Sequence, residues 1–443
     1  MSSKETILRP IKHLFGGTRL PHLKGTAEME TVAFSPDKVL IPLCQHIGAP
    51  CTPTVKKDDK VFVGTLIGDS EAYVSAPIHS SVSGIVTNII TKSFNGNDTQ
   101  YVEIESDGMF ENDPGLEPFT VDDTDSLIRA AKRCGLVGLG GAGIPTYAKF
   151  TTNKPIDTLI INGAECEPYI TSDTATMIER ADDIKVAVEA MVKYFNIKEV
   201  VLGLEKGSDE AQKEMEKIAS AIPNMKVKVL PKLYPQGGEK VLVYHTTGKV
   251  VGTGMLPIDV GCVVINCSTM ANIGKYILTG MPLVERCITV DGASVKEPKI
   301  VVAPIGTALK DVFDFCGGFK EEPFAVLYGG PMMGVAVPDL SVPVLKQTNA
   351  ILALTKKETS VPKETNCIRC GACVTNCPFG ITPPAIVKAY KNKDYDAMVK
   401  AGAELCMECG CCSYNCPANR PLVQTNKLAK AMIREYKAKE ANK

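Results

Sequence analysis

The sequence predicts a multidomain α/β protein with four parts: an N-terminal β half-barrel, a central parallel α/β domain, a small α+β domain and a C-terminal helical domain rich in cysteine. Three observations support this fold class. A chain of 443 residues is too long for one ordinary core. Short β-rich runs give way near residue 120 to alternating strand and helix patterns. Nine of the seventeen cysteines lie after residue 360. We place the domain boundaries at residues 1–120, 121–285, 286–350 and 351–443.

Composition excludes several classes of protein. Hydrophobic residues make up 44% of the chain and charged residues 22%, with a net charge of −1, so we expect a globular protein that binds no nucleic acid. No run of about 18 apolar residues is present, so we expect no membrane span. Lys4 and Arg9 interrupt any apolar stretch at the N-terminus, so we expect no signal peptide. Cluster-type cysteines without an export signal favour a reducing, cytosolic compartment.

The N-terminal part shows short runs of β-forming residues separated by Gly, Pro, Asn and Asp. The expected strands are Val39–Leu43, Lys60–Ile67, Ala72–Ala76, Gly84–Ile90 and Tyr101–Glu105. Residues 76–86 resemble the half-barrel of biotinyl and lipoyl carrier domains. Those domains need a lysine at a hairpin tip, whereas this segment has Ser80, Ser81 and Ser83. We therefore expect a structural, barrel-sandwich-like module and not a carrier.

The central part alternates strand and helix patterns, which predicts a parallel sheet. The expected strands are Asp157–Asn162, Glu199–Leu204, Lys226–Leu230 and Cys262–Asn266, and the expected helices are Ser126–Cys134, Asp182–Phe195, Ser208–Ile222 and Thr269–Leu278. Ligands of such sheets bind at the carboxyl ends of the strands. The loops after these strands are therefore the candidate sites.

The third part, residues 286–350, has strand patterns around Val290, Val302 and Leu327 and one helix pattern over Thr307–Phe315. Residues 351–363 read as a linker to the C-terminal domain. One long helical stretch is expected there, from Ala385 to Ala403, and the basic end of the chain is expected to form a solvated helix.

The C-terminal part carries the cysteine spacing C-x2-C-x2-C-x3-C-P twice. Thiolates at this spacing bind [4Fe–4S] clusters, and the fourth cysteine of each run ligates the other cluster. One cluster is then held by Cys367, Cys370, Cys373 and Cys416, and the other by Cys406, Cys409, Cys412 and Cys377. The alternative is a pair of zinc sites, which need four ligands each but no crossing cysteine. Cys411 is spare, and an exchange of roles with Cys412 stays open.

A glycine-rich segment, residues 135–143, follows the expected helix over 126–134. Gly138, Gly140 and Gly143 satisfy G-x-G-x-x-G, but a dinucleotide fingerprint should follow a strand and open a helix. We instead expect a cradle for a phosphate or a flavin, in which backbone N–H groups face the ligand and Lys149 adds charge. The alternative is a tight surface turn.

Three further polar segments follow strands of the central part. They begin at Asn162, Tyr234 and Asn266. Because the carboxyl ends of parallel strands share one edge of a sheet, we expect these segments to converge with the glycine loop on one site.

Together these segments resemble the flavin-binding, NADH-oxidising subunit of respiratory complex I and its hydrogenase relatives. The glycine loop of that family corresponds to residues 139–150, and its acidic loop to Asn162-Gly-Ala-Glu165-Cys-Glu167-Pro168. Its third and fourth loops correspond to Tyr234-Pro-Gln-Gly-Gly-Glu239 and Asn266-Cys-Ser-Thr269. Two positions depart from the family pattern, because Leu139 replaces an arginine and Ala164 an acid.

The added β module and the two-cluster motif make the whole chain look like the RnfC component of the Rnf complex, a membrane-bound ferredoxin:NAD oxidoreductase. The resemblance implies a β-grasp fold for residues 286–350. It implies that Glu167 and Glu239 position NAD(H). It implies FMN contacts from Gly140, Gly141, Gly143, Lys149, Asn162, Glu165, Tyr234, Asn266 and Thr269.

The resemblance also implies the activity. The chain would exchange a hydride between NAD(H) and FMN and pass single electrons through two [4Fe–4S] clusters. Its partners would be other Rnf subunits, which deliver electrons from ferredoxin and move Na⁺ or H⁺, and it would sit peripherally on the cytoplasmic face of the membrane. Two alternatives stay open: a diaphorase subunit of a soluble hydrogenase-type complex, and a non-catalytic iron–sulfur relay.

Overall fold

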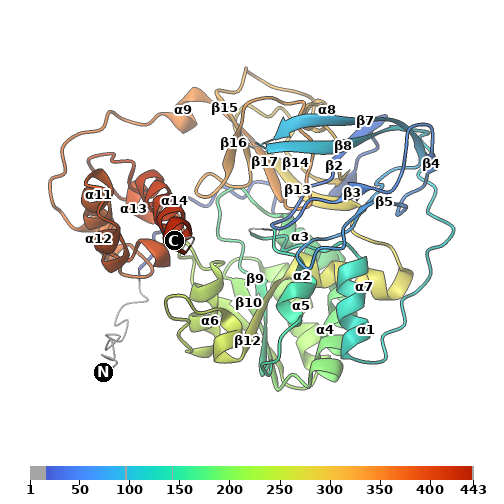
Figure 1. The fold of residues 1–443 in the computed structure, drawn as a ribbon, viewed down its shortest axis with the longest axis horizontal. Coiled ribbons are helices and arrows are strands. Elements are labelled where there is room, and N and C mark those ends of the chain that lie inside the picture. Colours follow the sequence, from blue (N-terminus) through green and yellow to red (C-terminus); the bar gives the residue numbers. More distant parts are fainter. Residues whose placement is uncertain (1–15, 95–96, 142, 442–443) are drawn as a thin grey trace. The chain divides into compact units, whose positions relative to one another are not determined.

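The computed structural model describes residues 16–94, 97–141 and 143–441, which form two compact units (Figure 1). Of these described residues, the larger unit comprises those within 22–231 and 257–359. The smaller unit comprises residues 16–21, 232–256 and 360–441. The chain therefore leaves the larger unit at residue 232, contributes residues 232–256 to the smaller unit, and re-enters the larger unit at residue 257.

The N-terminal part of the larger unit forms two small antiparallel sheets. The first has the order β2 (Lys38–Pro42), β8 (Asn97–Ser106), β7 (Gly84–Phe94), β4 (Lys60–Val61); the second has the order β3 (Thr52–Pro53), β5 (Leu66–Asp69), β6 (Ile78–His79). Val39 and Ile41 of β2 are buried and Lys38 is exposed, which is the alternation of a half-buried strand. The predicted β half-barrel is confirmed.

Two of the expected strands differ in the structure. Lys60–Ile67 is divided into β4 and β5 by Gly64, whose φ of +98° favours glycine. Residues 72–74 form bends, and residues 75 and 76 have no regular structure, so no strand forms here. Their polar groups bond elsewhere, because Ala76 N donates to His46 Nε2 (3.1 Å) and Ser75 Oγ donates to Ala49 O (3.1 Å).

The central sheet of the larger unit is parallel throughout, as predicted. Its order is β11 (Met225–Leu230), β10 (Glu199–Glu205), β9 (Thr158–Gly163), β12 (Cys262–Asn266). Around it lie α1 (Thr124–Arg133), α2 (Thr146–Phe150), α3 (Ser172–Glu179), α4 (Ala181–Phe195), α5 (Asp209–Ala221), η1 (Pro257–Val260) and α7 (Cys267–Thr279) (Figure 1). The predicted helices all form, and their ends have local causes. Asp123 and Ser126 cap α1 reciprocally, and α7 stops at Gly280 in the left-handed region.

A six-stranded mixed sheet completes the larger unit. Its order is β1 (Thr31–Ala33), β14 (Lys299–Pro304), β13 (Glu285–Asp291), β17 (Ala350–Leu354), β15 (Ala325–Tyr328), β16 (Val335–Val337), and α8 (Leu309–Phe315) and α9 (Lys356–Thr359) accompany it. The interpretation of residues 351–363 as a linker is wrong for its first part. All five residues of β17 are apolar and buried, and the strand pairs with β13 on one side and β15 on the other. A wholly apolar run of this kind is stable inside a sheet and not as a solvent-exposed linker.

One hydrophobic core runs through the N-terminal sheets and the central α/β part, and includes Val39, Ile104, Leu127 and Leu159. A second core, with Phe313 and Ile351, lies beneath the six-stranded sheet. The N-terminal module and the central part thus share one continuous hydrophobic core.

The smaller unit is helical, as predicted. It consists of α6 (Glu239–Thr247), α10 (Ala372–Thr375), α11 (Pro383–Lys391), α12 (Tyr395–Lys400), η2 (Ala403–Leu405), α13 (Cys411–Tyr414) and α14 (Leu422–Ala441). The single helix expected over 385–403 is wrong: Lys393 has a φ of +53°, and Asp394 caps a new helix by accepting from Ala397 N (2.9 Å). Ile386, Met398 and Ile433 hold α11, α12 and α14 together. In the part of the chain that the structure describes, no helix has both the length and the apolar character to span a bilayer.

Candidate functional site

The carboxyl edge of the central sheet contains a reversal of strand order. The chain runs outward from β9 to β10 to β11, and β12 then pairs on the other side of β9. Asn162, near the end of β9, lies in register with Asn266, the last residue of β12. Ligands of open α/β sheets bind outside the carboxyl ends at such a switch point. The structure therefore brings two of the expected polar segments together at that position.

The glycine loop lies over the β12–α7 junction. Its base is closed by a hydrogen bond from Gly138 N to Ile144 O (2.8 Å) and by a bridge between Val137 and Pro145. A Cβ at Gly140 would stand 3.0 Å from Asn266 Nδ2, whereas one at Gly141 would meet no atom within 4 Å. The loop follows α1 and not a strand, which is the local context that the sequence predicted. The loop offers an exposed tip of bare backbone beside the start of a helix.

Asn266 joins three elements by hydrogen bonds. It caps α7 by accepting from Ser268 N (2.9 Å) and Thr269 N (3.3 Å), and its Nδ2 donates to Asp173 Oδ2 (2.7 Å). Ser268 Oγ donates to the other oxygen of Asp173 (2.6 Å). Leu139 N, in the glycine loop, donates to Thr269 Oγ1 (3.5 Å). Asp173 was not predicted from the sequence, because nothing in Ser172-Asp-Thr marks it as the partner of a residue far along the chain.

Lys149 and Asn162 take up main-chain partners near the same edge. Lys149, on α2, donates through Nζ to Val264 O of β12 (3.0 Å). Asn162 Oδ1 accepts from Ala164 N (3.1 Å), which turns the chain out of β9. The lysine brings a positive charge to the strand that carries Asn266, which suits an anionic ligand.

Glu165 is a buried carboxylate that caps α3. It is 8% exposed and accepts from Asp173 N (2.9 Å), Thr174 N (3.2 Å) and Thr174 Oγ1 (2.9 Å). Burial raises its pKa, and the charge of Lys24 opposes that rise. These contacts satisfy N–H groups that the helix itself leaves unpaired. Its first structural task is thus to hold α3 and Asp173 at the switch point.

We expect Glu165→Ala to lower the stability of the larger unit by about 2–3 kcal/mol, because several buried donors lose their hydrogen-bond acceptor. Apparent melting temperature and urea unfolding would measure this. Glu199→Ala is the matched control, because it removes only an exposed ion pair with Lys226 and should cost well under about 1 kcal/mol. Equal losses for both variants would contradict the capping role.

The turn between β15 and β16 binds the side chain of Glu167 by hydrogen bonds. Its carboxylate accepts from Met332 N (2.9 Å) and Met333 N (2.8 Å). Burial is the largest influence and raises the pKa of Glu167 to about 7, although the two N–H groups and Lys24 favour the charged form. A Cβ at Gly330 would stand 2.3 Å from Glu167 Oε2, so only glycine permits this contact. A carboxyl group that titrates near neutrality beside a switch point is typical of a functional site.

In the smaller unit the eight motif cysteines gather in two groups. Burial raises the pKa of Cys373, and the neighbouring thiols of Cys416, Cys370 and Cys367 raise it further. Burial likewise raises the pKa of Cys412 to about 12, with contributions from Cys406, Cys409 and Cys377. Each group therefore contains three cysteines of one motif and the fourth cysteine of the other.

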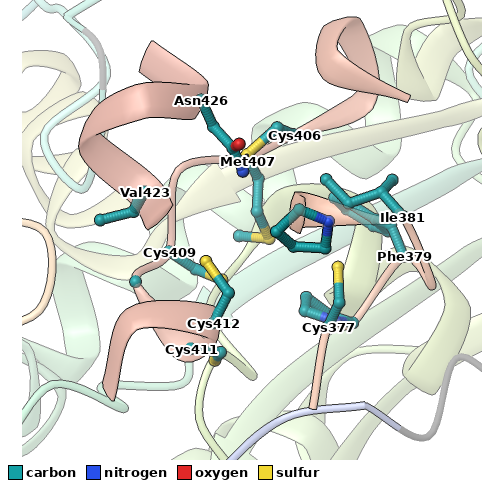
Figure 2. A pocket seen from close by; sticks show the side chains of 13 residues that line it. Cys377, Phe379, Ile381, Cys406, Met407, Cys409, Cys411, Cys412, Val423 and Asn426 are labelled. Carbon is teal, nitrogen blue, oxygen red and sulfur yellow. Dashed lines mark hydrogen bonds between the residues drawn. The ribbon is translucent and has the colours of Figure 1, made fainter. Parts of the chain in front are cut away.

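The second group surrounds a cavity (Figure 2). Cys377, Cys406, Cys409 and Cys412 line it together with Phe379, Ile381 and Met407. Asn426 Nδ2 donates to Cys406 Sγ (3.6 Å). Among the described residues, no group of three or more His, Cys, Asp and Glu side chains is placed to hold a single metal ion. Four thiols around an apolar space suit the corners of a cluster, whose charge such a lining helps to tune.

Cys411 also lines this cavity, and its thiol has a partner of its own. Its Sγ contacts Tyr234 O at 3.9 Å, and the side chain is fully buried. Figure 2 shows its sulfur below the Cys409–Cys412 segment, whereas the sulfur of Cys412 points into the space that the other thiols share. This arrangement favours Cys412 as the ligand.

Tyr234 and Glu239 belong to the smaller unit, and the other predicted flavin and nucleotide residues belong to the larger one. Tyr234 is buried, and its hydroxyl donates to Cys409 O (2.7 Å). Its main chain pairs with Thr18 in both directions (2.8 and 3.0 Å). Glu239 opens α6, where its negative charge favours the helix. The segment that begins at Tyr234 is thereby fastened to the second cysteine motif.

The residues present fit the two kinds of cofactor. Two thiol quartets supply the donor set of two iron–sulfur clusters. An exposed glycine tip, a capped helix start and a lysine supply the backbone N–H groups and positive charge that suit a flavin phosphate. Besides Asp173, no sequence pattern pointed to Lys346 and Gln347, which contact the base of the glycine loop.

Four family models match the chain. Residues 12–109 match the RnfC barrel sandwich hybrid domain, and residues 131–275 match the Nuo51 FMN-binding domain. Residues 287–336 match the SLBB domain, and residues 360–417 match the 4Fe-4S dicluster domain. The order of the four parts is the predicted one, while the boundaries at residues 120, 285 and 350 stay predictions.

Curated relatives match nearly the whole length. The chain is 42% identical over 80% of its residues to the RnfC-type component of the proton-translocating ferredoxin:NAD(+) oxidoreductase complex of Clostridium ljungdahlii, and covers 78% of that protein. It is 39% identical over 94% of its residues to the Na(+)-translocating counterpart of Acetobacterium woodii, and covers 96% of it. A solved NAD+-reducing [NiFe]-hydrogenase is a looser likeness, at 18% identity and a TM-score of 0.46 over 70% of this chain and 63% of that one.

Proposed function

Because this chain belongs to the RnfC family of Rnf complex components, we propose that it is the peripheral electron-transfer subunit of a ferredoxin:NAD⁺ oxidoreductase complex. The net reaction moves electrons from reduced ferredoxin, delivered through partner subunits, to NAD⁺. Those other subunits translocate Na⁺ or H⁺. The observation that supports the proposal is the switch point of the larger unit, where the glycine loop lies beside Asn266 in the part of the chain that matches an FMN-binding domain.

FMN, when bound, exchanges two electrons with NAD(H) as a hydride and exchanges single electrons with the iron–sulfur clusters. The chain's own residues bind and orient. Gly140, Gly141 and Gly143 would present their backbone to the flavin phosphate, and Lys149 would supply positive charge. Asn162 and Asn266 would bind the flavin from the two strand ends, and Thr269 holds the loop through Leu139. Glu165 supports this arrangement by capping α3.

The remaining flavin contact, Tyr234, belongs to the segment fastened to the second cysteine motif. Its hydroxyl donates to Cys409 O of the same unit.

The two clusters would be bound in crossed fashion. Cys367, Cys370, Cys373 and Cys416 would hold one, and Cys406, Cys409, Cys412 and Cys377 the other, an assignment that the neighbouring thiols support. Glu167 and Glu239 position the nicotinamide nucleotide. Hydride transfer needs no acid or base from the protein, so these carboxylates act by binding and orientation. The protein works on the cytoplasmic face of the membrane, where its partner subunits and NAD(H) meet.

An anaerobic NADH titration of the chain, reconstituted with FMN and iron–sulfur clusters, tests this function. We expect flavin absorbance to bleach at stoichiometric NADH. Glu167→Gln and Glu239→Gln should each weaken the response by about tenfold, the effect of losing one charged hydrogen bond. Glu199→Gln and Glu404→Gln are matched controls on exposed ion pairs of the same two units. A flavin-loaded chain that ignores NADH would leave only an iron–sulfur relay.

A further inference from the structure

Lys346 is a buried lysine that joins the three parts of the larger unit. It is 1% exposed, and its Nζ donates to Pro77 O (2.6 Å) and to Gly135 O (2.7 Å). Pro77 belongs to the N-terminal β module, Gly135 begins the glycine loop, and Lys346 lies between β16 and β17 of the six-stranded sheet. A buried ammonium is costly unless its hydrogen atoms find acceptors. These two carbonyls are therefore essential partners, and the lysine ties them together.

The surroundings of Lys346 offer no opposite charge from its titratable neighbours. Burial, then the charge of Lys346, lowers the pKa of His79 to about 3 and that of His46 to about 4. Burial raises the pKa of Cys134 to about 12 and also raises that of Cys51. All four are neutral near pH 7, so the main-chain carbonyls carry the stabilisation of the ammonium.

The next residue, Gln347, lies against the other end of the glycine loop. A Cβ at Gly143 would stand 2.3 Å from Gln347 Nε2, and Gly143 has a φ of +69°, so the position admits only glycine. Gln347 Nε2 donates to Gln45 O, and Lys346 N donates to Gln45 Oε1 (2.9 Å). Gln347 is thus held in place by the N-terminal module.

The N-terminal module also contacts the loop directly. Ile47 N donates to Gly143 O (3.1 Å). The loop is therefore fixed at Gly135 by Lys346 and at Gly143 by Ile47 and Gln347, while its tip at Gly140 and Gly141 stays exposed. A glycine-rich segment held at both ends loses less entropy when a ligand orders it, so its affinity for the ligand rises.

We propose that Lys346 and Gln347 are positioning residues for the flavin, and that the N-terminal β module and the β-grasp part serve as a brace that preorganises the glycine loop. This inference rests on the proposed FMN site and assigns a task to the N-terminal module. Loss of the brace lowers the fraction of chains with a competent loop, and the apparent Kd rises by the inverse of that fraction.

Lys346→Met and Gln347→Met test the brace in the full reconstituted chain. We expect each to raise the FMN Kd, measured by quenching of flavin fluorescence, by about tenfold. We also expect faster hydrogen exchange over residues 136–146 without FMN, while iron content stays unchanged. Lys299→Met is the matched control, because Lys299 also donates to a main-chain carbonyl, Phe315 O (3.2 Å), away from the loop. Lys299→Met should leave both the FMN Kd and the hydrogen exchange over residues 136–146 unchanged.

The outcomes separate the inference from the proposed function. A folded variant with a lower melting temperature but unchanged exchange and unchanged Kd would overturn the brace and leave a merely structural lysine. Should Lys346→Met not fold, Gln347→Met decides alone, because it keeps the ammonium. A wild-type chain that binds no FMN overturns the proposed function, whereas exchange over residues 136–146 still decides whether the loop is braced.

Discussion

Replacing Cys377 with serine is expected to remove the cluster of the second cysteine motif, not that of the motif in which Cys377 stands. The reason is the crossed grouping, in which Cys377 neighbours Cys406, Cys409 and Cys412. A cubane that loses one of four thiolates is expected to be lost or incompletely assembled. Iron analysis should fall from about eight to about four irons per chain. Cys416→Ser should likewise remove the cluster of the first motif.

Double variants reveal which cluster is lost. Cys377→Ser combined with Cys406→Ser should lose no more iron than either single variant, since both ligands serve one cluster. Cys377→Ser combined with Cys373→Ser should lose nearly all iron, although both residues belong to the same sequence motif. The reverse pattern of iron contents would refute the crossed assignment.

Cys411→Ser provides the matched control for these variants. Cys411 is buried beside the ligands, and its Sγ contacts Tyr234 O. We expect it to keep both clusters, whereas Cys412→Ser should lose one. Loss of iron in Cys411→Ser with retention in Cys412→Ser would mean that the two residues exchange roles.

Gly330→Ala is expected to weaken the response to NADH, although it replaces no residue that is predicted to bind the flavin or NAD(H). The added methyl would stand 2.3 Å from Glu167 Oε2 and 2.6 Å from its Cδ, so the carboxylate must leave the N–H groups of Met332 and Met333. Gly330 does not need a positive φ, so the effect is steric. Such overpacking costs about 1–3 kcal/mol, which corresponds to a rise of roughly 5- to 150-fold in the NADH concentration at half-bleaching.

The pH dependence supplies a second readout for Gly330→Ala. In the wild type, burial raises the pKa of Glu167 from 4.5 to about 7, so the folded chain keeps a proton that the unfolded chain has lost in this range. Stability from this group is full below about pH 4.5 and is lost as the pH rises through 7. The response to NADH should change over the same range. A carboxylate pushed toward water should titrate lower, and the transition should move to lower pH.

Gly334→Ala is a useful comparison in the same turn. Its methyl would stand 2.3 Å from Gly330 O and 2.6 Å from Tyr328 O. The substitution therefore distorts the turn, and the three atoms nearest to the new methyl do not include an atom of Glu167. If Gly330→Ala shifts neither the NADH response nor its pH dependence, the hydrogen bonds from the turn to Glu167 have no part in nucleotide binding.

Much of the fold followed from local patterns. Alternating strand and helix patterns predicted the parallel sheet from β9 to β12, and the cysteine spacing predicted the two groups of thiols. Such features can be read from sequence because neighbouring residues determine them: a period of two or 3.6 residues, or a fixed number of residues between ligands. The errors were also local, as at β17, where an apolar run next to a presumed boundary was taken for a linker.

The sequence by itself thus determined the order of the domains, the thiol quartets and the strand-end loops of this chain. Tertiary structure decided the rest. It turned Glu165 into a buried helix cap, joined Glu167 to a turn far along the chain, placed Lys346 beneath the glycine loop and tied Tyr234 to Cys409. These contacts join residues separated by up to 211 positions, as Lys346 and Gly135 are. Their partners are backbone groups that every residue carries, so no side-chain pattern announces them.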